Sequence, residues 1–191
     1  MKPAVRIQAR HPLKVVLRSI SRSDIEALRR WKNRHRRFFF HRQVITPEQQ
    51  ESWFEEYRRR DGDHMFMVIL NRRRVGCIGL RVLAEGLDVY NVILSDKRVG
   101  GRGLMSQALA AVVSYGRFLY PGLPTRVKVL RGNPAISWYG KNGFRRIAVA
   151  RDYVTMELRT ARDVGPFRCS LRLDIPFDNR LPARMPREKP S

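Results

Sequence analysis

A segment rich in glycine and arginine, KRVGGRGLMSQAL (Lys97–Leu109), contains the residues of this chain best suited to chemistry. It leads into an apolar run with helical spacing, made up of Leu104, Ala108, Leu109, Val112 and Val113. A loop that opens a helix directs backbone N–H groups and the positive end of the helix dipole toward one point. Glycines there let a phosphate approach the backbone. The segment therefore predicts an anion-binding loop, to which Arg98 and Arg102 add positive charge; the alternative is a tight turn that binds nothing.

The order of residues in this loop distinguishes between three phosphate-binding motifs. A P-loop requires Gly-Lys-Ser/Thr at its end, and GRGLMS lacks the lysine. A dinucleotide-binding fingerprint requires a third glycine where this chain has Ser106, inside a parallel βαβ unit. The third motif, R/Q-x-x-G-x-G/A, is complete in Arg98, Gly101 and Gly103. The loop therefore follows the third pattern.

Three strand-like runs precede the loop and must position it: HMFMVIL, VGCIGLRVL and DVYNVIL. The segments between them, NRRR (71–74) and AEGL (84–87), are short enough for hairpins. The pattern predicts an antiparallel meander whose last strand leads directly into the loop.

Two helices are expected before the meander, because each has an N-terminal capping pattern. Ser23, with Glu26 three residues later, predicts a capping box at the start of SDIEALRRW. Thr46, Pro47 and Gln49 predict another at the start of TPEQQESWFEEYRRR.

The remaining elements complete an α+β domain. A helix is expected from about Leu104 to Tyr120, followed by the strand TRVKVL, a short helix in NPAISWYGKNGF and the strands RRIAVA and DYVTMEL. Asn133 would cap the short helix and Gly143 would end it. With a first strand over residues 13–20, the order β-α-α-β-β-β-α-β-α-β-β predicts a mixed, mostly antiparallel sheet of about seven strands flanked by helices.

We expect one domain over residues 13–160, between a basic N-terminal extension (1–12) and a C-terminal tail rich in proline and arginine (161–191). The 191 residues, 43% of them apolar, are enough for one buried core. The two cysteines, Cys77 and Cys169, lack metal-ligand spacing, so we expect a reduced, cytoplasmic chain without a metal. No run approaches the ~18 apolar residues of a membrane span, and the N-terminus lacks the apolar region of a secretory signal.

The formal net charge of +22 favours anionic partners. Most of the 39 basic residues are arginine, and a genome biased toward arginine codons would give the same total. The charge therefore leaves open an alternative function, a basic module that binds RNA or the ribosome. Neither an RNP1-type aromatic motif nor a zinc-finger pattern supports that alternative.

A second motif, SWYGKNGF (Ser137–Phe144), follows the loop. Together, the loop, this motif and the order of elements around them resemble the GCN5-related N-acetyltransferase (GNAT) superfamily over roughly residues 14–158. SWYGKNGF is similar to the family's LYxxxGF segment, with Tyr139 at the family tyrosine. GLMSQAL is similar to the branch that acetylates the N-termini of ribosomal proteins. WKNRHRRFFF followed by ITPEQQESWF is similar to the branch that acetylates amino groups of nucleotide-linked sugars.

This resemblance implies an enzyme that transfers an acetyl group from acetyl-coenzyme A to a primary amine, such as an amino sugar nucleotide or a protein N-terminus. The expected partners are these two substrates, for a monomer or homodimer. A main-chain N–H within residues 91–94 would polarise the thioester carbonyl, and Tyr139 would protonate the departing thiolate. The residues that the resemblance assigns to cofactor binding are Ile93, Leu94, Arg98, Val99, Gly100, Gly101, Arg102, Gly103 and Leu104.

The resemblance leaves the general base and the acceptor-binding residues open. Several relatives carry a glutamate on the strand that reads DVYNVIL here, so the base is Asp88, Tyr90, Glu85 or a chain of water molecules. Asn133 lies six residues before the tyrosine instead of the usual seven, so it is a coenzyme ligand or only a cap. The side chains that would line an acceptor pocket, or else pack in the core or face solvent, are Trp31, Asn33, Arg34, Arg36, Arg37, Phe38–Phe40, Trp53 and Phe54.

Overall fold

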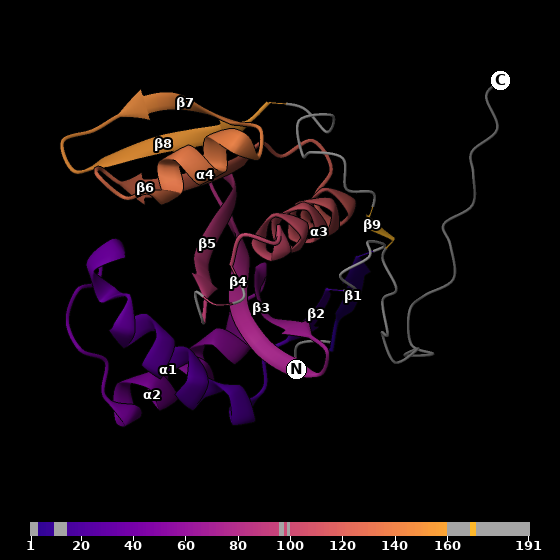
Figure 1. The fold of residues 1–191 in the computed structure, drawn as a ribbon, viewed down its shortest axis with the longest axis vertical. Helices are drawn as coiled ribbons and strands as arrows, with labels where there is room; N and C mark the ends of the chain where they lie inside the picture. Colours follow the sequence, from indigo (N-terminus) through magenta and orange to yellow (C-terminus); the bar gives the residue numbers. More distant parts are fainter. Residues whose placement is uncertain (1–3, 10–14, 96–97, 99, 160–168, 171–191) are drawn as a thin grey trace, which may run out of the picture.

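The computed structural model describes residues 4–9, 15–95, 98, 100–159 and 169–170. Its strands form one sheet in the order β7-β8-β6-β5-β4-β3-β2-β1-β9 (Figure 1). Every neighbouring pair is antiparallel except β5 and β6, which are parallel. The predicted α+β class with a mostly antiparallel sheet is therefore confirmed.

The elements follow one another with short connections. The strands are β1 (Arg6–Ala9), β2 (Val16–Ser19), β3 (Asp63–Leu70), β4 (Arg73–Leu83), β5 (Gly86–Leu94), β6 (Thr125–Leu130), β7 (Phe144–Val149), β8 (Tyr153–Leu158) and β9 (Cys169–Ser170). The helices are η1 (Arg22–Asp24), α1 (Ile25–Arg34), η2 (Arg36–Phe38), α2 (Pro47–Arg59), α3 (Leu104–Leu119) and α4 (Ala135–Lys141), where η marks a single 3₁₀ turn. None of the helices in the described part of the chain combines the length and the apolar character needed to cross a membrane.

The sheet has nine strands where about seven were expected. Strand β1 lies within residues 1–12, the expected extension, and pairs with β2 so that Ile7 faces Leu17. Both side chains are fully buried. The second additional strand, β9, lies within the expected tail and pairs with β1.

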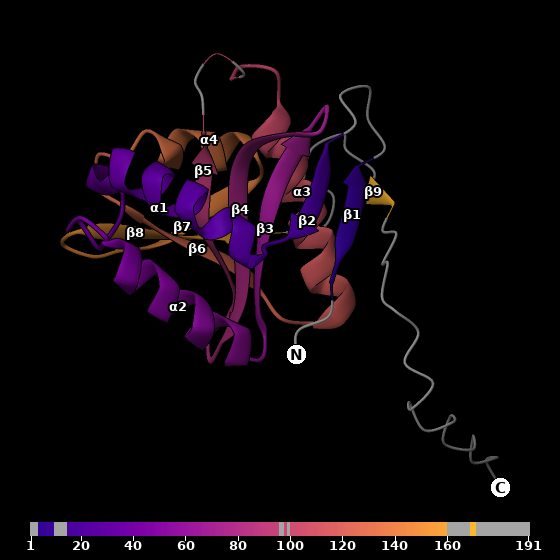
Figure 2. The same ribbon diagram turned by 90° about the horizontal axis from the view of Figure 1, so that it is seen from below.

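Two helical layers cover opposite faces of the sheet. Figure 2 shows α1 and α2 on one face and α3 on the other. Because side chains alternate along a strand, β3 contributes to both cores: Phe66 and Val68 pack with α3, while Met65 and Met67 pack with α1 and α2. The central strands are therefore buried on both faces, as their long apolar runs indicate.

The start of the first helix differs from the prediction. The capping pair is Ser21 and Asp24, whose carboxylate accepts hydrogen bonds from the backbone N–H (2.8 Å) and the hydroxyl (2.9 Å) of Ser21. The predicted partner Glu26 instead binds Arg29. At α2 the prediction is confirmed, because Thr46 forms the expected capping box with Gln49 and Pro47 occupies the first turn.

Strand β5 contains a bulge that reverses which side chains face which helical layer. Its register with β4 jumps from the pair Gly79 and Tyr90 to the pair Cys77 and Ile93, and Asn91 has a left-handed φ of 48°. In the described residues β5 pairs with β6 at only two positions, Leu87 and Asp88. After the bulge, the edge of β5 on the side of β6 therefore forms no strand pairing in the described residues, and its backbone can make other contacts.

Candidate active site

A cavity of about 560 Å³ lies where β5, the glycine loop and the start of α4 meet. We call it the loop cavity. It is lined by Val92, Leu94, Gly100, Gly101, Gly103, Leu104, Met105, Ser106, Pro134, Ala135, Trp138 and Tyr139. The lining is mostly apolar along β5 and α4 and consists of bare backbone along the loop. This suits a long ligand with an apolar stem and an anionic group.

The glycines of the loop are required by backbone conformation. Gly101 and Gly103 have φ values of 76° and 73°, in the left-handed region that L side chains rarely adopt. A Cβ added at either position would meet nothing within 4 Å. The backbone of the loop therefore borders open space that a ligand can enter.

The first turn of α3 presents its N–H groups without a side-chain cap. Gly103 occupies the N-cap position and has no side chain that could accept a hydrogen bond. The first N–H groups of a helix have no partner within it, and their positive dipole end attracts anions. This helix start and the left-handed glycines together form a site suited to a phosphate.

The structure brings about half of the predicted cofactor residues to the loop cavity. Leu94 and Leu104 line it together with the three loop glycines. Ile93 lies on the opposite face of β5, because the bulge directs Val92 and Leu94 into the cavity instead. Two other predicted residues, Arg98 and Arg102, are exposed and lie outside the lining, while Val99 lies outside the described residues.

Several lining residues were not predicted, although the sequence contains a signal for some of them. Val92 follows from the alternation along β5 once the bulge is known. Ala135 lies one helical turn before Tyr139, which was predicted, and Pro134 lies one turn before Trp138. All four residues therefore share one side of α4. A bulge has no reliable sequence signature, which explains why Ile93 was expected where Val92 lies.

Tyr139 is a buried hydroxyl at the loop cavity. Only 4% of its surface is exposed. Its ring packs edge to face against Trp138 and Phe144, with distances between ring centroids of 4.8 and 5.4 Å. Burial raises the pKa of Tyr139, and the carboxylate of Asp88 raises it further. A tyrosine is protonated at neutral pH even at its ordinary pKa of 10.0, and the raised pKa extends the protonated range of Tyr139 to higher pH.

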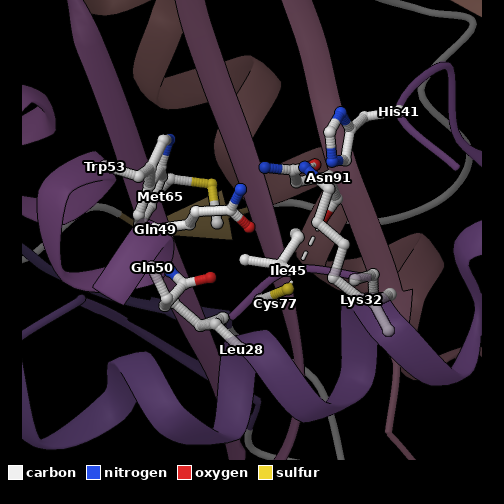
Figure 3. A pocket seen from close by; sticks show the side chains of 11 residues that line it. Leu28, Lys32, His41, Ile45, Gln49, Gln50, Trp53, Met65, Cys77 and Asn91 are labelled. Carbon is white, nitrogen blue, oxygen red and sulfur yellow. Dashed lines mark hydrogen bonds between the residues drawn. The ribbon is translucent and has the colours of Figure 1, made fainter. Parts of the chain in front are cut away.

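A second cavity of about 250 Å³ lies on the opposite face of β5, under α1, α2 and the segment between them (Figure 3). We call it the Lys32 pocket. It is lined by Leu28, Lys32, His41, Ile45, Gln49, Gln50, Trp53, Met65, Cys77, Asn91 and Ile93. Val92 and Ile93 are neighbours on β5 but face different cavities, so this strand separates the two.

The bulge residue Asn91 is held by two partners in the Lys32 pocket. The Lys32 ammonium donates to its side-chain oxygen at 3.1 Å, and the Cys77 thiol donates to its main-chain carbonyl at 3.3 Å. Figure 3 shows Lys32 reaching from α1 toward Asn91. Burial lowers the pKa of Lys32 and raises that of Cys77 to about 12. These contacts hold the backbone of β5 at the bulge.

None of the three predicted candidates for the general base lines either cavity. Glu85 forms an ion pair of 2.9 Å with Lys128 at the surface. Asp88 forms one of 2.9 Å with Arg81, and burial raises its pKa. The Tyr90 hydroxyl donates a hydrogen bond to the carboxylate of Asp63 on β3. The ionisable groups that line the Lys32 pocket, Lys32, His41 and Cys77, come from other elements and were not predicted.

Of the side chains suggested for the acceptor, Trp53 lines the Lys32 pocket. Asn33 instead holds the segment between α1 and α2, because its amide donates to and accepts from the backbone of Ile45, both at 2.9 Å. Asn133 accepts from the backbone N–H of Ala135 at 2.9 Å, as a cap does, and donates to the carbonyl of Phe38 at 3.3 Å. Asn133 is thus a structural residue at the start of α4.

The remaining aromatic side chains of that set serve other contacts, while its three arginines, Arg34, Arg36 and Arg37, are exposed. Trp31 and Phe39 pack on the core beneath α1 and α2, where Phe54 is buried. Phe38 lies beneath the Arg37 guanidinium, and the exposed Phe40 contacts Tyr153 edge to face.

Solved structures with the same fold include several acetyltransferases. Apo FdhC, a nucleotide-linked sugar GNAT, aligns with a TM-score of 0.67 at 15% identity, covering 80% of this chain and 88% of its own. The spermidine N-acetyltransferase from Vibrio cholerae in complex with CoA and spermine gives 0.63 at 17%, covering 75% and 94%. RimL, the ribosomal L7/L12 alpha-N-protein acetyltransferase, gives 0.64 at 14%, covering 79% and 93%. At such low identities these similarities show the fold alone.

The family is shown by the sequence itself. No curated protein matches the chain. Residues 14–145, however, match the family model of the acetyltransferase (GNAT) domain. This range includes the glycine loop and the SWYGKNGF segment, the two motifs on which the resemblance rested. The chain therefore belongs to the GNAT acetyltransferase family.

Proposed function

We propose that this protein is an N-acetyltransferase that moves the acetyl group of acetyl-coenzyme A to a primary amine. The observation that carries the proposal is the position of β5 between two cavities. One cavity ends at an uncapped helix start and left-handed glycines, and the other is smaller and combines five polar side chains with six apolar ones. A transferase needs such an arrangement, because its two substrates must meet at one point from different directions.

The loop cavity would hold acetyl-coenzyme A. Backbone N–H groups between Gly100 and Leu104 would bind the diphosphate, and the apolar side chains of Val92, Leu94 and Trp138 would line the path of the pantetheine arm. The thioester would then lie near the bulge. There a main-chain N–H of β5 would stabilise the negative charge that develops on the carbonyl oxygen.

The transfer forms one C–N bond and breaks one C–S bond. The neutral amine attacks the thioester carbon and then loses a proton to a base or to a chain of water molecules. The thiolate leaves with a proton from Tyr139, whose raised pKa keeps it protonated until that step.

The acceptor is an amino sugar nucleotide or a protein N-terminus in this proposal. The two resemblances within the sequence, GLMSQAL and WKNRHRRFFF followed by ITPEQQESWF, support it. The competing proposal, an RNA- or ribosome-binding module with little or no activity, rests on the net charge of +22.

The thermal midpoint of the protein with and without acetyl-coenzyme A separates these two proposals. A ligand that binds only the native state at about 100 times its Kd adds about 2.7 kcal/mol of stability. We expect a clear rise in midpoint with acetyl-coenzyme A, and release of free thiol when an amine is acetylated. An unchanged midpoint at saturating acetyl-coenzyme A, with RNA retention that falls steeply with salt, would favour the binding module.

A further inference from the structure

We infer that the Lys32 pocket selects an acceptor whose amine lies close to a phosphate or carboxylate group of the same molecule, and that Lys32 binds this anionic group. The inference rests on the proposed function and specifies its acceptor by charge. It excludes polycationic amines, which carry no anionic group.

The lining of the Lys32 pocket contains no carboxylate. Its eleven residues include two basic side chains, Lys32 and His41, and three amides, Gln49, Gln50 and Asn91. A cation next to the reacting amine would have to enter this lining without a counter-charge, which is costly in a partly enclosed site. An acceptor with an anionic group would instead gain a charge-assisted hydrogen bond.

Lys32 has donors to spare for such a group. An ammonium carries three N–H donors, and Asn91 is the one hydrogen-bond acceptor that Lys32 contacts among the described residues. The ring of Phe39, with its centroid 5.5 Å from the ammonium, adds no acceptor atom. Burial lowers the pKa of Lys32, and a bound anion would reverse this effect because it favours the charged form.

The chain around the pocket adds positive charge on the outside. From Ala27 to Pro47 the sequence has no aspartate or glutamate. Four exposed arginines in this stretch have no carboxylate partner among the described residues, and we call them the arginine rim: Arg34, Arg36, Arg37 and Arg42. The rim lies on the segment between Lys32 and Ile45, both of which line the pocket. It would attract an anionic acceptor and repel a cationic one.

The size of the pocket limits what enters it. At about 250 Å³, the pocket is smaller than most sites for drug-sized ligands, which have volumes of about 300–1,000 Å³. The pocket would therefore take the amine and its nearest anionic group, while the rest of a larger acceptor lies along the arginine rim.

Four small primary amines test the charge preference directly: ethanolamine, phosphoethanolamine, β-alanine and 1,4-diaminobutane. Ethanolamine carries no charge besides its amine, phosphoethanolamine and β-alanine also carry a phosphate or a carboxylate, and 1,4-diaminobutane carries a second ammonium group. Binding is followed by the intrinsic fluorescence of coenzyme A-saturated protein, since Trp53 lines the pocket, and turnover by thiol release. We expect at least one anionic amine to exceed ethanolamine about tenfold in affinity or kcat/KM, and diaminobutane to rank last. The ratio of phosphoethanolamine to β-alanine tells which anion is preferred.

Lys32→Met removes the proposed contact, with Lys32→Gln as a second variant if the first folds poorly. We expect the kcat/KM of the anionic amine to fall about tenfold more than that of ethanolamine, so that its advantage disappears. A loss common to both amines would report the contact between Lys32 and Asn91. Arg30→Met is the matched control, because Arg30 is a cation on the same helix with 69% of its side chain exposed, and it faces Glu26 instead of the pocket. It should preserve the advantage.

Three results would overturn the inference. The first is binding of the anionic amines that is no tighter than that of ethanolamine, undetectable binding included. The second is diaminobutane as the best acceptor. The third is an equal loss on all acceptors in both Lys32 variants, which would show a role in proton transfer or structure. If acetyl-coenzyme A still binds and some amine is acetylated, the proposed function survives these results; if acetyl-coenzyme A does not bind, the proposed function fails first.

Discussion

Tyr139 is the residue to which the proposal assigns the clearest chemical step. It lines the loop cavity and is buried, and burial raises its pKa further above neutral pH. A phenylalanine there would retain the ring contacts with Trp138 and Phe144 and lose only the hydroxyl. The step therefore can be tested without disturbing the packing of α4.

We expect Tyr139→Phe to lower kcat by about a hundredfold, which is within the usual range for one general acid, and to leave acetyl-coenzyme A affinity unchanged. The wild-type kcat should show no tyrosine deprotonation between about pH 7 and 9, since the pKa is raised above its ordinary 10.0. Steady-state kinetics and a direct binding titration measure the two quantities separately.

Tyr115→Phe is the matched control for that variant. Tyr115 is also a buried tyrosine with a raised pKa, but it packs against Phe66 and lies outside both cavities. Its kcat should stay near that of the wild type. A Tyr139→Phe variant with the same kcat as Tyr115→Phe would remove Tyr139 from the proposed chemistry.

At this scale, local sequence patterns predicted one side of the candidate site and not the other. Gly101, Gly103 and Tyr139 lie in two short motifs, and the structure brings both to the loop cavity. Lys32 and Asn91 are 59 residues apart and meet only because α1 packs over the bulge of β5. A pair of this kind has no local signal, since neither residue differs in type from many exposed lysines and asparagines.

The elements were predictable where periodicity is strong. The meander, α2, α3 and the strands after α4 all combine a long apolar pattern with a clear turn or cap. Strand β1 contains one large apolar residue, Ile7, between Arg6 and Gln8, with Val5 just before the strand. This short pattern was not distinguished from a basic extension. The burial of β1 depends on its pairing with β2 and on its packing against α3, which follows much later in the sequence.

The start of α1 shows how a tertiary contact decides between two local signals. SRSDIE contains two serines that each precede an acidic residue by three positions. The structure uses Ser21 with Asp24, because Arg18 on β2 donates two hydrogen bonds of 2.9 Å to that carboxylate. The alternative pair, with Glu26, has no such partner on the sheet and was therefore the wrong choice.

Strand β1 can be tested as a part of the fold. We expect Ile7→Ala to lower the free energy of unfolding by about 2–5 kcal/mol, because the side chain is fully buried and its removal leaves a cavity. Arg6→Ala, at the exposed neighbouring position, should change it by less than about 0.5 kcal/mol. Urea denaturation measures both, and equal small effects would show that β1 adds little to the stability of the domain.

For the whole molecule, the main feature is that one bulged strand separates two unlike cavities. The loop cavity is suited to an anionic ligand with a long apolar stem, while the smaller Lys32 pocket sets Lys32, His41 and three amides among six apolar side chains. The net charge of +22 fits both if the two ligands are anionic, so it does not require RNA as a partner. The net charge is thus consistent with the enzyme as well as with the binding module. Binding of coenzyme A at the glycine loop distinguishes the two proposals.

Isothermal titration of coenzyme A into wild type, Gly101→Asp and Gly122→Asp tests the loop most directly. Gly122 is the matched control, since it has a φ of 84°, open space around its Cβ position and no part in either cavity. An aspartate at either glycine adds similar backbone strain and the same charge. We expect Gly101→Asp to weaken binding at least tenfold through repulsion of the diphosphate, and Gly122→Asp to bind as the wild type does. Undiminished coenzyme A binding by a folded Gly101→Asp variant, or its absence in the wild type, would contradict the account.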